Sequence, residues 1–281
     1  MPKILDGKKL SKIILEKYKK ILDKRIEDKK QIPSLAVIQV GIDPASSVYI
    51  RHKEKACARV GIRFLGHRLA EDISEEELIK LIEDLNQLPD VSSILVQLPL
   101  PDHINTKKIL EIIDPRKDAD GFHRVNMGQL LIDAESRDYI PPCTPAGIME
   151  LLDYYEISIS GKHCVVLGRS NIVGKPIAMM MLARNATVTI CHSRTKNLAE
   201  ITRQADIIVA AIGRPNFLRA DMIREGVVLV DVGINRLDNG KLCGDIDFLD
   251  CEQKASAITP VPGGVGPMTI AGLIRNVITD H

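Results

Sequence analysis

The stretch VVLGRSNIVGKPIAMMML, residues 165–182, decides the fold of this chain. A short apolar run ends at Gly168, five residues follow, and Gly174 then opens a segment with the composition of a helix. A strand, a glycine turn and a helix in this order are typical of a phosphate site, because the free N–H groups and the dipole at a helix start favour an anion. The spacing, however, fits neither GxGxxG nor the triphosphate loop GxxxxGK[ST].

A triphosphate loop is excluded by two features of this stretch. Five residues instead of four separate the glycines, and Lys175 is followed by Pro176, so the hydroxyl that would bind magnesium is absent. Pro176 suits the first turn of a helix, where its missing N–H costs nothing. A dinucleotide is therefore the better candidate ligand, with a tight turn that binds nothing as the alternative.

The next strand, TVTICHSRT at 187–195, indicates which dinucleotide is bound. Proteins that bind NAD usually end this strand with an acidic residue, which bonds the ribose 2′-hydroxyl. Here the strand ends without a carboxylate and supplies Ser193 and Arg194, while Arg169 and Ser170 follow the first glycine. Two arginines and two serines would accept a 2′-phosphate, so the predicted cofactor is NADP. Surface arginines without a ligand remain the alternative.

Strands and helices alternate along the whole chain, which predicts an α/β fold with mostly parallel strands. In the first half we expect strands at 34–40, 62–69 and 92–100 and helices at 7–30, 46–60, 78–85 and 106–113. The second half has the dinucleotide-fold pattern, with strands at 163–168, 187–192, 206–213 and 227–233 and helices at 175–182, 197–205 and 220–226. Ser46 or Ser47 is the expected cap of the second helix, and Ser74 with Glu77 forms a capping box.

The pattern predicts two domains. The first domain covers 1–141, a Rossmann-type domain covers 142–266, and a closing helix within 267–281 packs back on the first domain. A helix at 144–155, with Thr144 as cap and Pro145 in its first position, bridges the two. Residues 114–130 read as a long functional loop, and a glycine–proline loop at 259–268 precedes a helix at 269–278.

Composition excludes several classes of protein. The 281 residues are 45% apolar but only 3% aromatic, and Trp is absent, so the core is aliphatic and base-stacking platforms for nucleic acid are not expected. Net charge is +1, without a basic patch. The six cysteines form no CxxC pair and the seven histidines no metal spacing, which predicts a reducing compartment and no metal site. The charged N-terminus and the lack of an apolar run of about 18 residues favour a cytoplasmic protein without membrane contact.

The first half carries a set of polar residues that could form a catalytic pocket. Tyr49 and Lys53 are four residues apart and lie on one helix face, although such a pair alone is also common in surface packing. Gln97 ends an apolar strand, where α/β proteins build their sites. Of Asp118 and Asp120, one could bond the edge of a basic heterocycle while the other caps a turn.

Several long stretches of the chain match one enzyme family. They are VGIDPASSVYIRHKEKAC, ILVQLPLP, KDADGFH, PPCTPAGIMELL, VVLGRSNIVGKP, TVTICHSRT, ADIIVAAIG and TPVPGGVGPMT. Over essentially its full length the chain resembles the bifunctional methylenetetrahydrofolate dehydrogenase/methenyltetrahydrofolate cyclohydrolase family. The resemblance implies an N-terminal α/β catalytic domain that binds folate, a Rossmann-type NADP-binding domain, a cleft between the two, and a homodimer.

The resemblance also implies roles for individual residues. Lys53 would be the key catalytic residue, helped by Gln97, Tyr49 and Asp120. The substrate, a tetrahydrofolate derivative, would contact Tyr49, Gln97, Leu98, Pro99, Asp120, Pro262, Gly263 and Gly264. NADP would contact Gly168, Arg169, Ser170, Val173, Gly174, Ser193, Arg194, Gly213 and Ile234. The implied reactions are NADP-dependent oxidation of 5,10-methylenetetrahydrofolate and hydrolysis of the methenyl product to 10-formyltetrahydrofolate.

The chain departs from the family pattern at two places. Arg124 stands after DGFH where the family commonly has proline, and Leu88 stands where it commonly has aspartate. Two other functions stay open from the residues alone. One is a different two-domain NADP-dependent dehydrogenase, acting on a small hydroxy or amino acid, and the other is a folate- or nucleotide-binding module without turnover.

Overall fold

A computed structural model describes residues 2–136, 138–237 and 239–279 of the chain. Its internal contacts form two compact units. Unit 1 comprises Met1–Lys12, Leu130–Glu135 and Pro142–Gly272, and unit 2 comprises Ile13–Gln129, Ser136–Pro141 and Leu273–His281. The limits expected from the sequence, at 141/142 and 266/267, stay a prediction. The end of the predicted closing segment, residues 280–281, lies outside the described residues.

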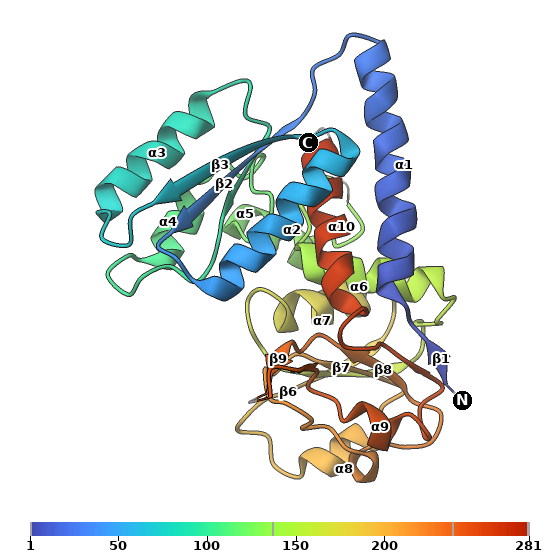
Figure 1. Cartoon of the computed structure of the whole chain (residues 1–281). Helices are drawn as coiled ribbons and strands as arrows, with labels where there is room; N and C mark the ends of the chain where they lie inside the picture. The colour runs from blue at the N-terminus through green and yellow to red at the C-terminus, as the bar shows by residue number, and fades with distance from the viewer. Residues whose placement is uncertain (1, 137, 238, 280–281) are drawn as a thin grey trace. The chain divides into compact units, whose positions relative to one another are not determined.

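Unit 2 is built on a parallel three-stranded sheet in the order β3-β2-β4. The strands are β2 (Ser34–Val40), β3 (Arg63–Leu69) and β4 (Ser93–Val96). Helices α3 (Glu75–Gln87) and α4 (Thr106–Ile112) pack their apolar sides on one face, and α2 (Pro44–Val60) lies across the other (Figure 1). The central strand β2 is therefore buried along its whole length, whereas the edge strand β3 is partly exposed.

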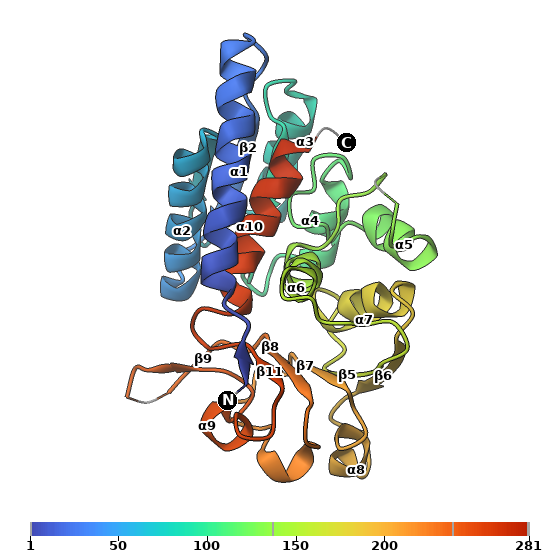
Figure 2. The same cartoon turned by 90° about the vertical axis from the view of Figure 1, so that its right-hand side faces the viewer.

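Unit 1 contains a parallel six-stranded sheet in the order β1-β11-β8-β7-β5-β6. Its strands are β1 (Lys3–Ile4), β5 (His163–Leu167), β6 (Thr187–Cys191), β7 (Ile207–Ala210), β8 (Val228–Asp231) and β11 (Ala257–Ile258). Helices α6 (Cys143–Tyr154) and α7 (Gly174–Ala183) lie on one side of the sheet, and α8 (Leu198–Thr202) and α9 (Phe248–Cys251) on the other (Figure 2). The chain leaves β5 for β6 on one side and returns to β7 on the other, which makes β5 the topological switch point.

The remaining elements connect and extend these two sheets. They are α1 (Gly7–Glu27), α5 (Arg124–Ile132), the 3-10 turn η1 (Ala220–Met222), the antiparallel pair β9 (Asn235–Arg236) and β10 (Leu242–Cys243), and α10 (Val265–Ile278). The α/β class and the second-half alternation expected from the sequence are thus confirmed. Within the described residues no helix is long and apolar enough to cross a membrane.

Two predicted helix caps are wrong. Asp43 caps α2, because its carboxylate accepts a hydrogen bond from the Ser46 N–H at 2.6 Å, so neither Ser46 nor Ser47 is the cap. Helix α6 begins after Pro142 without a side-chain cap, and the Thr144 hydroxyl instead lies 2.9 Å from that of Thr269. The capping box of Ser74 and Glu77 on α3 is confirmed.

Three loop and helix predictions also need correction. The segment 114–130, expected to be a loop, contains most of α5, and the helix expected from 269 begins at Val265. The helix expected at 220–226 is only the turn η1. The two-residue strands and the short α9 were not predicted, because so few residues carry no recognisable hydrophobic period.

Candidate functional site

Lys53 is a buried lysine on the face of α2 that Tyr49 shares one turn earlier. Only 6% of Lys53 is exposed, and its Nζ donates a hydrogen bond to Gln97 Oε1 at 3.0 Å. Gln97 follows β4 directly, and its Nε2 donates to the Leu98 carbonyl at 2.8 Å. This second bond orients the amide so that its oxygen, not its nitrogen, faces the lysine. The structure therefore brings together the amine and the amide that the sequence singles out.

Tyr49 is half-buried beside this pair. Burial raises the pKa of its phenol above the ordinary value, so the hydroxyl stays neutral at physiological pH. A neutral aromatic ring with one polar end can lie against a flat heterocycle and still bond to water or ligand.

Asp118 organises the turn between α4 and α5, beside Ile94 of β4. Its buried carboxylate accepts hydrogen bonds from the Gly121 N–H at 3.1 Å, the His123 N–H at 2.7 Å and Asn126 Nδ2 at 3.0 Å. Burial raises the pKa of Asp118, and these donors oppose the rise. The expectation that one of the two aspartates caps a turn is confirmed, and the capping residue is Asp118.

Asp120 lies within electrostatic reach of Lys53. Burial raises the pKa of the Asp120 carboxyl, and the charge of Lys53 opposes this rise. Asp118 fixes the backbone on both sides of Asp120, and Asp120 itself is half-buried. Lys53, Gln97 and Asp120 thus form one polar group in unit 2, with Leu98 and Pro99 immediately after Gln97.

Arg124, the first departure from the family pattern, is the first residue of α5. A proline suits that position, so the family residue and Arg124 are both compatible with the helix start. Arg124 forms an exposed ion pair with Glu111 and is not one of the three donors to Asp118. Leu88, the second departure, ends α3 as its C-cap and is 48% exposed.

A pocket of about 430 Å³ opens in unit 1 where β5, β6 and β7 end. Its position at the switch point is where open α/β sheets bind ligands. The lining residues come from the three strand ends and the turns after them: Leu167, Gly168, Arg169, Cys191, His192, Ser193, Thr195, Leu198, Ala211, Ile212, Arg214 and Phe217.

The turn between β5 and α7 requires both of its glycines. Gly168 has a φ of +114°, and a Cβ there would collide with the Ala211 carbonyl; a Cβ at Gly174 would collide with the Gly168 carbonyl. The Ser170 hydroxyl accepts from the N–H groups of Val173 and Gly174, both at 3.2 Å. Ser170 therefore closes the turn itself and occupies N–H groups at the helix start. Its predicted contact with a cofactor stays a prediction, as does that of Val173.

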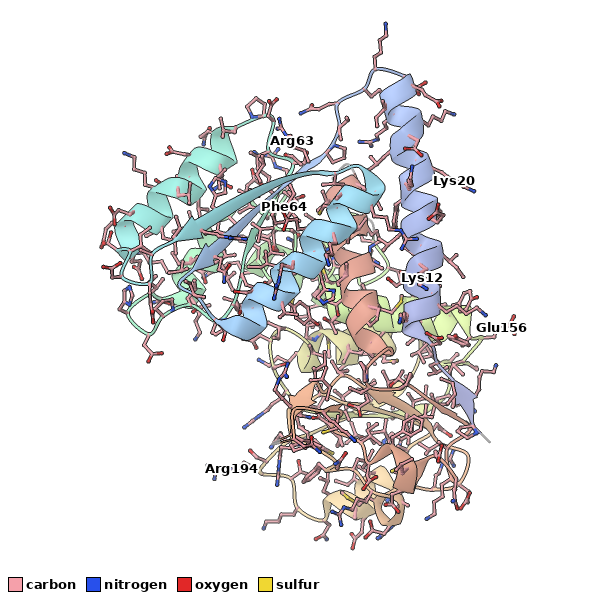
Figure 3. All side chains as sticks on the ribbon, viewed as in Figure 1. Lys12, Lys20, Arg63, Phe64, Glu156 and Arg194 are labelled. Atoms are coloured by element: carbon pink, nitrogen blue, oxygen red, sulfur yellow. The ribbon has the colours of Figure 1, made fainter. Side chains whose placement is uncertain are left out.

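The pocket lining includes three of the predicted cofactor residues, Gly168, Arg169 and Ser193. Arg194 lies outside the lining, is exposed, and extends away from the ribbon (Figure 3). The other predicted residues outside the lining are Ser170, Val173, Gly174, Gly213 and Ile234.

Sequence reasoning missed several lining residues that follow the same strand ends. Arg214, the most notable, places its guanidinium 4.5 Å from the centre of the Phe217 ring. The signal that could have found it is its position just beyond β7, a parallel neighbour of β5.

The chemistry of this lining fits a phosphorylated dinucleotide. Arg169 and Arg214 supply two cations, Ser193 and Thr195 supply hydroxyls, and no carboxylate is among the lining residues that the structure describes. Such a donor set suits the extra phosphate of NADP rather than a free ribose hydroxyl.

The glycine–proline loop belongs to unit 1 and is tightly folded. The Gly263 carbonyl accepts from the Lys8 N–H at 2.8 Å, and the Gly264 N–H donates to the Pro260 carbonyl at 2.7 Å. The roles of Pro262, Gly263 and Gly264 in binding substrate stay predictions. Across the described part of the chain, no cluster of three His, Cys, Asp or Glu side chains is suited to a metal ion.

Models of two protein-family domains match the chain. Residues 5–120 match the tetrahydrofolate dehydrogenase/cyclohydrolase catalytic domain, and residues 142–281 match the NAD(P)-binding domain of the same family.

Relatives with similar sequences and structures agree with this match. The bifunctional protein FolD of Lachnoclostridium phytofermentans is 54% identical over 278 residues, which covers 99% of this chain and 97% of the relative. The crystal structure of FolD from Campylobacter jejuni, at 50% identity, superposes with a TM-score of 0.96 over 99% of this chain and 97% of that one. The FolD structure from Trypanosoma brucei, complexed with NADP and an inhibitor, has 38% identity and a TM-score of 0.93, covering 99% and 97%.

Proposed function

The chain belongs to the tetrahydrofolate dehydrogenase/cyclohydrolase family, and from this premise we propose which of its residues carry the two reactions. It is a bifunctional enzyme that oxidises 5,10-methylenetetrahydrofolate with NADP and hydrolyses the methenyl product to 10-formyltetrahydrofolate. The other two-domain dehydrogenase considered from the sequence is not favoured, because the relatives at high identity are bifunctional folate enzymes.

Folate binding and cofactor binding are assigned to the two groups of residues described above. Tyr49 lies against the pterin ring system, and Asp120 accepts hydrogen bonds from its N–H edge. The 2′-phosphate of NADP is held by Arg169, Ser193 and Arg194. The nicotinamide of the bound cofactor would accept the hydride from the one-carbon bridge of the substrate. The nitrogens of the substrate stabilise the resulting cation, so this step needs positioning more than proton transfer.

Lys53 serves the hydrolytic step. Water attacks the methenyl carbon, and a proton must leave before the ring opens. The support for Lys53 in this role is its bond to Gln97 at 3.0 Å, which fixes the amine in a buried position near Asp120. In its neutral form, an amine held at one place can take a proton from the attacking water and then return that proton to the departing nitrogen.

Lys53→Met tests this role. Methionine fills similar space without an amine, so we expect methenyltetrahydrofolate hydrolysis to fall by about 10²–10⁴, the usual worth of general acid–base help. Hydrolysis is measured from the loss of methenyl absorbance. Lys55→Met, on the same helix but exposed, is the control and should hydrolyse like wild type. A Lys53→Met rate equal to the control would show that the lysine has another role.

The double change Arg169→Ala and Arg194→Ala tests the cofactor site. Losing both guanidinium groups should raise the KM for NADP by at least about tenfold while the KM for NAD changes little, because only NADP carries the phosphate. Steady-state dehydrogenase assays with each cofactor measure the two values. Arg219→Ala, an exposed arginine elsewhere in unit 1, is the control. Equal changes with both cofactors would contradict a phosphate contact.

We further propose a cytoplasmic homodimer that supplies formyl groups for purine biosynthesis. All six cysteines are free, and five of them are buried, which suits a reducing compartment. The edge strand β3 pairs only with β2 among the described strands and carries the half-buried Phe64 (Figure 3), so a second copy could cover it. Analytical ultracentrifugation tests the dimer, and a monomer at micromolar concentration would refute it.

A further inference from the structure

One buried carboxylate holds the loop that follows β7. Asp245 is fully buried, and its Oδ2 accepts hydrogen bonds from the N–H groups of Ile212 at 2.7 Å and Gly213 at 3.0 Å. Its Oδ1 accepts from the Arg214 N–H at 2.8 Å. The main-chain carbonyl of Asp245 accepts in turn from the Phe217 N–H at 2.7 Å. Both ends of the segment 212–217 are therefore attached to one residue.

This segment forms one wall of the dinucleotide pocket. Ile212, Arg214 and Phe217 all line the pocket, and the guanidinium of Arg214 lies over the Phe217 ring. The backbone at residues 212–214 sets where the arginine side chain starts, and the Phe217 ring sets where it ends. Asp245 is hydrogen-bonded to the backbone N–H groups of both residues.

A second carboxylate positions the first. Asp231, 4% exposed, accepts from the Asp245 N–H at 2.9 Å and from the Ile246 N–H at 2.9 Å. The two acids approach the chain so closely that a Cβ at Gly233 would collide with the Asp245 carboxylate, and one at Gly244 with that of Asp231.

Two neighbouring buried acids are costly, because burial disfavours their charged forms. The cost is visible in Asp231, where burial raises the pKa to about 7. Backbone N–H groups offset part of this cost, and those that Asp245 accepts from belong to residues 212–214 of the pocket segment.

We propose that Asp245 is a positioning residue for dinucleotide binding, whose carboxylate fixes the backbone of 212–214 and so places Arg214 and Phe217 against the ligand. The inference rests on the assignment of this pocket to NADP in the proposed function. Asp245 itself does not line the pocket.

Asp245→Asn is the test, because asparagine keeps the shape but turns one acceptor into a donor that faces the backbone N–H groups. We expect the Kd for NADP, measured by isothermal titration calorimetry, to rise at least about tenfold, as for a lost charge-assisted bond. The loss in NADP affinity should exceed any loss in methenyl hydrolysis, which uses no dinucleotide, by at least about tenfold. A general loss of folded structure would instead lower the NADP affinity and the hydrolysis rate together.

Asp250→Asn is the matched control. Asp250 also accepts a backbone hydrogen bond, from the Ala220 N–H at 2.7 Å, but it bonds no residue of segment 212–217. Its variant should bind NADP and hydrolyse methenyltetrahydrofolate like wild type. A folded Asp245→Asn variant that binds NADP within twofold of wild type would overturn the proposal.

Two further variants, Asn235→Ala and Arg169→Ala, complete the test. If Asp245→Asn does not fold, Asn235→Ala replaces it in the test. Asn235 Nδ2 donates a hydrogen bond to Asp245 Oδ1 at 2.9 Å, and the loss of this bond should weaken NADP binding about threefold. Unchanged affinity in a folded Asn235→Ala variant would then overturn the proposal. Arg169→Ala, titrated in the same way, distinguishes the positioning role of Asp245 from the assignment of the pocket to NADP. If Arg169→Ala weakens NADP binding and Asp245→Asn does not, only the positioning role fails. If neither variant weakens NADP binding, the pocket assignment fails as well.

Discussion

At the scale of single residues, the motif KDADGFH shows how one short sequence can hold two carboxylates with different tasks. Asp118 has a structural role in the turn, because its carboxylate accepts three hydrogen bonds from groups up to eight residues further along the chain. Asp120 lies within electrostatic reach of Lys53 and is not one of the groups that hold this turn. The sequence predicted the division of tasks but could not assign it, because the assignment depends on α5, whose Asn126 returns to Asp118.

Asp118→Asn should lower the stability of the protein and weaken its binding of the folate substrate. The amide can no longer accept from all three donors, so the free energy of unfolding should fall by about 1–3 kcal/mol. The KM for the folate substrate should rise because Asp120 loses its fixed position, while the KM for NADP stays unchanged. Urea unfolding and steady-state kinetics measure these effects. Asp102→Asn, in an exposed turn, is the control, and an Asp118→Asn variant as stable as that control would contradict the capping role.

At the scale of elements, the sequence predicted best where a local signal is unique. The capping box of α3 is such a signal, since Ser74 and Glu77 satisfy each other's backbone donors. The start of α2 is the opposite case: Ser46 or Ser47 was expected as the cap, but both lie inside the helix, and Asp43 before it has the extended backbone that a cap requires. The pocket ends of β5, β6 and β7 were predictable because parallel strands end at one edge, whereas the pairing of Asp231 with Asp245 depends on where the chain returns after β9 and β10.

Ser74→Ala measures how much the cap contributes to its helix. Removing the hydroxyl leaves the Glu77 N–H without its partner, so the free energy of unfolding should fall by about 1 kcal/mol. Both enzyme activities should be unchanged at 25 °C, because α3 carries none of the site residues. Chemical unfolding is the measurement, with the exposed Ser160→Ala as control. A Ser74→Ala variant indistinguishable from Ser160→Ala would show that solvent replaces the cap.

At the scale of the whole molecule, buried acids set the pH dependence of stability. Burial raises the pKa of Asp231 to about 7, and it raises those of Asp118 and Asp120 as well. Between about pH 4, where aspartates in the unfolded chain titrate, and pH 7, the folded protein keeps a proton that the unfolded chain has lost. Unfolding therefore releases protons in this window, and stability must fall as the pH rises through it.

The free energy of unfolding should accordingly be lower at pH 7.5 than at pH 5.5, by up to about 1.4 kcal/mol per pH unit for each proton retained. Urea unfolding at the two pH values measures the difference. Asp231→Asn removes the titrating group, and its stability should change less between the same two values. Wild-type stability that is equal or greater at pH 7.5 would contradict a protonated Asp231 in the fold.

The division of work between Lys53 and the dinucleotide pocket is tested most directly in one cuvette. Lys53→Met is given 5,10-methylenetetrahydrofolate and NADP, and the absorbances of NADPH and of the methenyl compound are followed together. We predict that NADPH continues to form while methenyltetrahydrofolate accumulates, because the oxidation needs positioning and the hydrolysis needs the amine. Methenyl decay at the wild-type rate, with no accumulation, would contradict it.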